Sequence, residues 1–157
     1  MAKRSRQTTS YVFAMVEVHV ADSEVKREDA FAVRHTVFVE EQDVDEELEY
    51  DTHDETATHF VAYDGDEPIG AARLREYEDD IGKVERVAVR TSRRNAGIGR
   101  ALMERLEKQA EAIGFDTLTL HSQTQAADFY RTLGYERRGA EFEEAGIPHV
   151  EMRKSLE

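Results

Sequence analysis

The fold is decided by a stretch in which a strand pattern gives way to a helix pattern, Arg93-Arg94-Asn95-Ala96-Gly97-Ile98-Gly99-Arg100. The run before it, Val84-Glu85-Arg86-Val87-Ala88-Val89, is rich in β-branched residues and predicts a central strand. After it, apolar residues recur at helical spacing up to Ile113, and Gly114 is expected to end this helix as a left-handed cap. A strand, a glycine-containing turn and a helix start bring free backbone N–H groups and the positive helix end together, which favours phosphate binding.

The residue types within this stretch fit a loop that an anion approaches closely. Gly97 and Gly99 leave room for a ligand at the backbone, and Asn95 tolerates a left-handed conformation. Between residues 86 and 100 lie five arginines and no acidic residue, which requires either an anionic partner or a structural reason. A dinucleotide loop would need glycine where Leu102 stands, and a Walker loop would need Gly-Lys followed by Ser or Thr, which the chain lacks.

Outward from this stretch, hydrophobic periodicity predicts the element order β-α-β-β-β-α-β-α-β-β. Asp22 and Ser23 are candidate caps for a first helix that reaches Phe38, and a turn at Gly146-Ile147-Pro148 is expected to join the last two strands. Strands in a row followed by β-α-β-α-β predict a mixed sheet with helices on its faces. The expected strands lie at residues 16–20, 58–63, 69–75, 84–89, 117–120, 135–142 and 149–154, and the two later helices at 97–113 and 124–133.

The length and composition suit one soluble domain. The chain has 157 residues, and we expect a loose arm over residues 1–10 followed by a single domain over residues 11–157. The absence of cysteine excludes disulfide scaffolds, thiol nucleophiles, zinc fingers and iron–sulfur clusters. No apolar stretch approaches the roughly 20 residues that span a bilayer, and no signal-peptide pattern follows Met1, so we expect a cytoplasmic protein without a membrane partner.

The charge balance bears on partners and on habitat. The formal net charge is −13, which makes nucleic acid an unfavourable partner. Acidic enrichment with little lysine suits a protein that is soluble in concentrated salt, so a halophilic source is one hypothesis and an ordinary acidic cytosolic protein is the other.

Most residues from Glu40 to Glu55 are Asp or Glu. We interpret this segment as a solvated loop outside the core, with attraction of a cationic amine as the alternative. The spacing of His53, Asp54 and His59 fits neither a zinc helix nor a calcium loop, and no metal is expected.

The phosphate-loop stretch resembles the R-x-x-G-x-G motif of the GNAT superfamily of acyl-CoA N-acyltransferases, with Arg94, Gly97 and Gly99 in register. Downstream, Ala126-Ala127-Asp128-Phe129-Tyr130 followed by Gly134-Tyr135 is similar to the A-x-x-x-Y and G-F motifs of that family. Further segments resemble its ElaA-like branch, namely residues 34–42, Asp51, His59, residues 120–123 and residues 146–150.

This resemblance implies an α/β fold with a mixed, mostly antiparallel sheet of about six to seven strands. Three to four helices would flank the sheet, with a β-bulge and a splay at the acyl-CoA site. It also implies acetyl-CoA as cosubstrate, an amine acceptor, no metal and a possible homodimer. The residues implied to bind acetyl-CoA are Val87, Ala88, Val89, Arg94, Asn95, Ala96, Gly97, Ile98, Gly99 and Arg100.

Three residues are candidates for proton transfer in a direct attack of the amine on the thioester. The resemblance makes Tyr130 the general acid that protonates the leaving thiolate, whereas its alternative is a core tyrosine on an amphipathic helix. Glu85 is the first candidate base, and its alternative is a solvent-facing residue paired with Arg86. His121 is a second candidate base or a structural residue at a strand end.

Two other functional classes stay open at this stage. One is a non-catalytic acyl-CoA-binding regulatory module, and the other is an acidic interaction domain without a nucleotide ligand. Phe31, Val33 and Phe38 recur at helical spacing and are interpreted as core rather than as an acceptor pocket. The sequence does not identify the acceptor.

Overall fold

The computed structural model describes residues 16–157, and the arm expected over residues 1–10 lies outside this range. The predicted element order is confirmed, with short additional helical turns between the main elements. The elements in chain order are β1 (Val16–Val20), α3 (Glu24–Arg34), the π-helix η1 (His35–Glu41), α4 (Glu46–Glu49), η2 (Thr52–Glu55), β2 (Thr58–Asp64), β3 (Glu67–Glu78), β4 (Ile81–Val89), η3 (Thr91–Arg93), α5 (Ile98–Ile113), β5 (Thr117–Gln123), η4 (Thr124–Ala126), α6 (Ala127–Thr132), β6 (Glu136–Glu144) and β7 (Ile147–Ser155).

The strands form one seven-stranded mixed sheet with the order β1-β2-β3-β4-β5-β7-β6. Every neighbouring pair is antiparallel except β4 and β5, which run parallel. The expected mixed, mostly antiparallel sheet is therefore confirmed. The two ends of the helix after the phosphate loop also lie as predicted, with Gly114 in a left-handed conformation at φ 111°.

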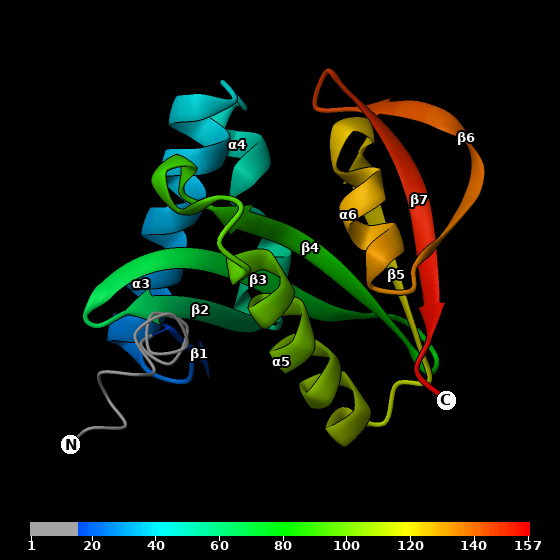
Figure 1. Cartoon of the computed structure of the whole chain (residues 1–157), viewed down its shortest axis with the longest axis horizontal. Coiled ribbons are helices and arrows are strands. Elements are labelled where there is room, and N and C mark those ends of the chain that lie inside the picture. The colour runs from blue at the N-terminus through cyan, green and yellow to red at the C-terminus, as the bar shows by residue number, and fades with distance from the viewer. Residues whose placement is uncertain (1–15) are drawn as a thin grey trace, which may run out of the picture.

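β4 and β5 separate halfway along their length. They pair only from Ile81 to Val84 on β4 and from Thr117 to Leu120 on β5, and Figure 1 shows them diverging beyond this point. On its other edge β4 carries a bulge opposite β3, where Arg86 has a φ of 58°. The expected bulge and splay are both present, and the second half of β4 has a free edge toward β5.

Helices cover both faces of the sheet (Figure 1). On one face, α5 and α6 pack onto a core that includes Phe60, Leu74 and Met152. On the other face, α3 packs through Ala30 and Val33 onto β2, β3 and β4. The Oγ atom of Ser23 accepts a hydrogen bond from Lys26 N, as expected for the cap of this helix.

The interpretation of residues 40–55 as a solvated loop was wrong for part of the segment. It contains the short helices α4 and η2, and Glu49 and Asp54 are buried residues with 2% and 8% exposure. Both carboxylates bond the guanidinium group of Arg34, which is itself fully buried. These acids are internal because a buried arginine requires counter-charges.

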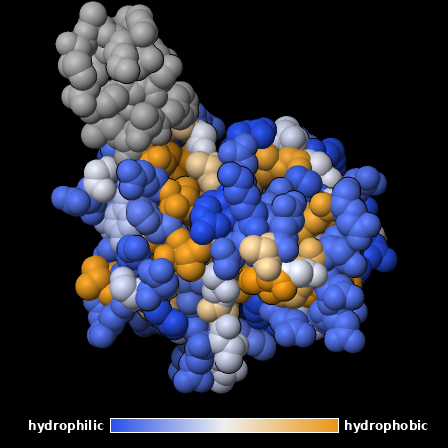
Figure 2. All heavy atoms as spheres, turned by 90° about the horizontal axis from the view of Figure 1, so that it is seen from below, coloured by the Kyte–Doolittle hydropathy of each residue, from blue (hydrophilic) through white to orange (hydrophobic). Residues whose placement is uncertain are grey.

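The surface outside this network is largely polar. Figure 2 shows hydrophilic residues over most of one face, with hydrophobic side chains in small separate groups. Within residues 16–157, none of the helices is long and apolar enough to cross a membrane. The last turn differs slightly from the expected one, since it lies at Ala145 and Gly146, and Ile147 and Pro148 already belong to β7.

Candidate functional site

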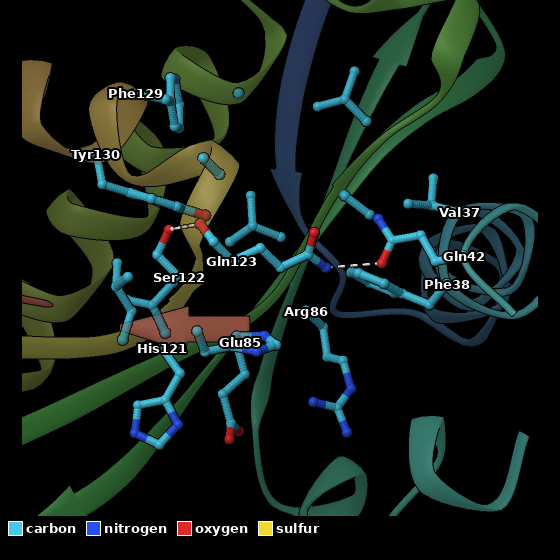
Figure 3. Close-up of a pocket in the computed structure, with 18 of the residues that line it drawn as sticks. Val37, Phe38, Gln42, Glu85, Arg86, His121, Ser122, Gln123, Phe129 and Tyr130 are labelled. Carbon is cyan, nitrogen blue, oxygen red and sulfur yellow. Dashed lines mark hydrogen bonds between the residues drawn. The ribbon is translucent and has the colours of Figure 1, made fainter. Parts of the chain in front are cut away.

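A cleft of about 980 Å³ opens where β4 and β5 diverge. Its walls come from the free end of β4, from β5, from η1, from α6 and from the loop before α5. Figure 3 shows Phe129 and Tyr130 from α6 on one side of this cleft and Phe38 and Gln42 from the η1 region on the other. The three candidate proton-transfer residues, Glu85, His121 and Tyr130, all line it.

The loop before α5 presents a series of backbone N–H groups that have no partners within residues 16–157. The first helical hydrogen bond joins Ala101 N to Gly97 O at 3.0 Å, and no side chain of residues 16–157 caps the helix. Among the described residues, no backbone carbonyl accepts a hydrogen bond from the amides of residues 95–100. Asn95 adopts a left-handed conformation at φ 66°, as its residue type predicted, and Gly97 does so at φ 83°. The geometry is that of an anion site at a helix N-terminus.

Gly99 has a packing role in addition to the ligand approach expected for it. A Cβ atom at this position would lie 3.0 Å from Cζ of Phe129, closer than side chains normally approach. Gly99 therefore allows α5 to pack against the α6 side chain that forms the cleft wall, rather than only admitting a ligand to the backbone.

The arginine-rich run between residues 86 and 100 has a largely structural reason. Arg86 bonds Glu49 and Asp51, Arg90 donates to Pro68 O, and Arg93 pairs with Asp64 and Glu67. Arg94 donates to both carboxylate oxygens of Glu41 at 2.6 and 2.9 Å, and its Nε donates to Val89 O at 3.0 Å. Arg100 is the one member of the run without a side-chain partner among the described residues.

The free edge of β4 directs two backbone amides toward the cleft. Arg90 N donates to Ile69 O on β3, which fixes the edge to which this residue points. Because successive residues in a strand direct their backbone groups to opposite edges, the N–H groups of Val87 and Val89 face the β5 side. Ala88 lies between them and buries its side chain in the α3 core.

Tyr130 combines a buried ring with an unpaired hydroxyl. The side chain is 8% exposed, and burial raises the pKa of its phenol above the ordinary value. The hydroxyl makes no hydrogen bond with any residue in the range 16–157. Figure 3 shows the ring pointing toward Ser122 and Gln123 at the end of β5. The hydroxyl is thus protonated and available to a group in the cleft.

Glu85 is held by cations rather than facing solvent beside Arg86. Its Oε1 accepts from Arg73 Nη2 at 2.6 Å and from Arg75 Nε at 2.8 Å, and Lys83 Nζ lies 3.5 Å from Oε2. Burial opposes ionisation, but the hydrogen bond from Arg75 and the charge of Arg73 bring the pKa of Glu85 down to about 2. A carboxylate held in this way is a weak proton acceptor.

His121 forms a pair with a carboxylate on the neighbouring hairpin. Its Nδ1 lies 2.8 Å from Glu144 Oε1, and its ring meets the Phe142 ring edge-on. The hydrogen bond with His121 lowers the pKa of Glu144. When Nδ1–H donates to Glu144, Nε2 keeps its lone pair, so that a neutral His121 is suited to accept a proton.

Several cleft residues were not identified from the sequence. Phe38 was interpreted as core, whereas it packs against the α3 core and lines the cleft as well. Gln123 Nε2 donates to Gln42 Oε1 at 2.8 Å, which connects β5 to the end of η1 across the cleft (Figure 3). Their distance in sequence, 81 residues, explains why no local pattern indicated this contact.

We compared the chain with family models, with the sequences of known proteins and with solved structures. A family model described as an acetyltransferase (GNAT) domain matches residues 20–156. The N-acetyltransferase YjcF of Bacillus subtilis, itself uncharacterised, is 45% identical over 136 residues, which cover 86% of this chain and 96% of YjcF. A crystal structure from Lactobacillus plantarum, provisionally named an N-acetyltransferase, has a TM-score of 0.84 at 32% identity and covers 90% of this chain and 98% of its own. Escherichia coli ElaA shares the fold, with a TM-score of 0.77 at 24% identity over 89% of this chain and 98% of its own.

Proposed function

The chain belongs to the GNAT acetyltransferase family, and from this premise we propose that it transfers the acetyl group of acetyl-CoA directly to an amine, with Tyr130 as general acid and His121 as general base. The single observation that carries the donor assignment is the set of unpaired amides at residues 95–100, placed at the mouth of the cleft. The ElaA-like branch is part of the proposal and is supported by the motifs quoted above and by the shared fold.

The diphosphate of coenzyme A would bind to the backbone of the loop before α5. Asn95, Ala96, Gly97, Ile98 and Gly99 supply the amides, with the positive helix end behind them. Arg94 would act mainly by bracing the loop against Glu41 and Val89, and Arg100 is available at the edge of the site. An aminoglycoside 6'-N-acetyltransferase with this fold has been solved in complex with coenzyme A, which supports coenzyme A as the ligand by analogy.

The groups around the point where β4 and β5 diverge would carry out the reaction. The amine nitrogen bonds to the thioester carbon while the carbon–sulfur bond breaks. One proton passes from the nitrogen to His121 Nε2, and another passes from the Tyr130 hydroxyl to the departing sulfur. The amides of Val87 and Val89 are directed to the same region and would polarise the thioester oxygen.

Replacing Tyr130 with phenylalanine is expected to lower kcat by about 10²–10⁴-fold, because the thiolate then leaves without a proton donor. The affinity for CoA, measured by calorimetry, should change little, since the loop amides are untouched. Tyr135→Phe is the matched control: that hydroxyl bonds Glu107 on α5, outside the cleft. Equal losses of kcat in both variants would count against Tyr130 as the acid, and a Tyr130→Phe enzyme with full activity would favour a non-catalytic role for this tyrosine.

Replacing His121 with glutamine is expected to lower kcat by about 10²-fold or more, with CoA affinity retained, because glutamine has no basic nitrogen. Glu85→Gln serves as the comparison, since a carboxylate with a pKa of about 2 contributes little as a base at neutral pH. The activity of both variants is measured as the release of free CoA with a panel of amine acceptors. A large loss in Glu85→Gln alone would reverse the assignment of the base.

A further inference from the structure

A buried lysine in the cleft has no hydrogen-bond acceptor in the described part of the chain. Lys83 lies on β4, is 9% exposed and lines the cleft. Within residues 16–157 its ammonium group makes no hydrogen bond, and its contact with Glu85 Oε2 is an ion pair at 3.5 Å. The ring of Tyr77 lies 5.4 Å from Nζ and contributes a cation–π contact. A lysine buried to this degree normally has a full partner.

The nearest carboxylate is already shared among other cations. Glu85 accepts hydrogen bonds from Arg73 and Arg75, the latter through both Nε and Nη2. Arg73 is balanced in addition by Asp51 and Asp54, which leaves Arg75 and Lys83 with Glu85 as their common counter-charge. Asp51, Asp54 and Glu49 are shared in turn with Arg34 and Arg86. Among residues 16–157 the whole network therefore has five cations against four carboxylates, an excess of one positive charge.

The other titratable groups near Lys83 do not remove this excess by direct contact. The charge of Lys83 contributes to lowering the pKa of Glu144, but Glu144 is hydrogen bonded to His121 and lies 4.0 Å from His149 Nε2. Arg75 is a neighbour of Lys83 across β3 and β4, where the two residues pair in register. Two cations thus stand side by side at one end of the cleft.

The sheet places these cations on the face that carries the candidate base. Lys83 pairs in register with Thr119 on β5, and His121 lies two residues further along that strand. Side chains alternate between faces, so Lys83, Glu85 and His121 share one face. Two residues correspond to roughly 7 Å along a strand, a distance that the flexible stem of a lysine spans.

We propose that the acceptor carries a carboxylate, which binds Lys83 and Arg75 while its amine lies toward His121, so that the substrate class is that of amino acids. This inference rests on the proposed function and specifies its acceptor. A single excess positive charge suits a monoanion such as a carboxylate better than a doubly charged phosphate. The bond changes are those of the acetyl transfer itself, and the carboxylate is unchanged by the reaction.

The test compares amino acids with their amides, which keep the amine and lose the charge. Acetylation of a panel of L-amino acids, β-alanine and 4-aminobutyrate is measured against the matching carboxamides, for the wild type and for Lys83→Met. The wild type is expected to favour one or more carboxylates by at least about tenfold in kcat/KM. Lys83→Met should lower kcat/KM for these by about 10–100-fold, mainly through KM, and leave the amides unchanged.

Lys108→Met on the exposed side of α5 is the matched control and should change neither class. Lys83→Arg should restore part of the carboxylate preference. A loss that is equal for acids and amides would overturn the inference, as would a wild-type preference for amides, phosphoethanolamine or polyamines. Calorimetry with acetyl-CoA separates the two levels: no binding contradicts the proposed function, whereas binding without carboxylate preference contradicts only the acceptor class.

Discussion

Replacing Arg34 with methionine is expected to lower the free energy of unfolding by about 3–5 kcal/mol. Arg34 is fully buried and bonds Glu49 Oε2 at 2.5 Å, Asp54 Oδ1 at 2.8 Å and Glu49 O at 2.9 Å. Methionine fills a similar volume but leaves two buried carboxylates with one cation fewer. Of the arginines within residues 16–157, Asp54 keeps only Arg73 and Glu49 keeps only Arg86. Their desolvation would then lack much of its compensation.

Chemical denaturation of the wild type and the variant measures this effect. Arg131→Met is the control. Arg131 is 53% exposed in a surface pair with Asp128, and its replacement is expected to lower the free energy of unfolding by about 0–1 kcal/mol.

The dependence of stability on acid pH supplies a second measurement of the same network. Burial of Asp54 by itself would raise the pKa of its carboxyl group, but the guanidinium groups of Arg34 and Arg73 hold this pKa below its ordinary value. Asp54 therefore stabilises the fold above its unfolded pKa and loses this contribution as the pH falls through the folded pKa. A variant as stable as Arg131→Met would show that the network is dispensable.

Local patterns predicted the elements because each depends on near neighbours. The period-two run at Val16–Val20 and the helical stripe from Ile98 to Ile113 each bury one face. Asn95 and Gly114 were identified because a positive φ selects these residue types. The same holds for Ser23, whose hydroxyl caps a helix within three residues.

The side-chain partners could not be predicted because they depend on register and on distant segments. For Glu85, the first candidate base, the alternative was a solvent-facing pair with Arg86, yet the hairpin of β3 and β4 brings Arg73 and Arg75 to it across 12 and 10 residues. His121 meets Glu144 only because β5, β7 and β6 lie side by side. One signal was available: Arg34 falls at helical spacing between Phe31 and Phe38, where a charged residue indicates a buried partner.

Part of the acidic content has a structural role. Glu49 and Asp54 neutralise internal arginines, and Glu41, Asp64 and Glu67 neutralise arginines of the phosphate-loop region. The ion pairs of these five acids explain their presence without adaptation to salt. The halophilic source stays a prediction, which depends on the acids that remain at the surface.

Replacing Gly97 with aspartate is expected to weaken CoA binding at least about 100-fold. At φ 83° a side chain is strained, and a carboxylate at the start of α5 would repel the diphosphate at the point where the amides of residues 95–100 converge. Titration calorimetry with CoA measures the affinity, and thermal unfolding reports how much stability the strain removes. Gly97→Ala introduces a Cβ atom without charge, so its loss of affinity should be smaller than that of the aspartate.

The matched control is Gly114→Asp at the other end of the same helix. Gly114 is also left-handed, at φ 111°, and nothing lies within 4 Å of a Cβ atom built there. This variant carries the same change of residue and a comparable backbone strain, but its carboxylate stands about 25 Å from the phosphate loop along a helix that rises 1.5 Å per residue. It should lose stability and keep its affinity for CoA. If Gly97→Asp bound CoA within about threefold of the wild type, the diphosphate would have to lie elsewhere. The assignment of the loop, and of the donor site with it, would then be wrong.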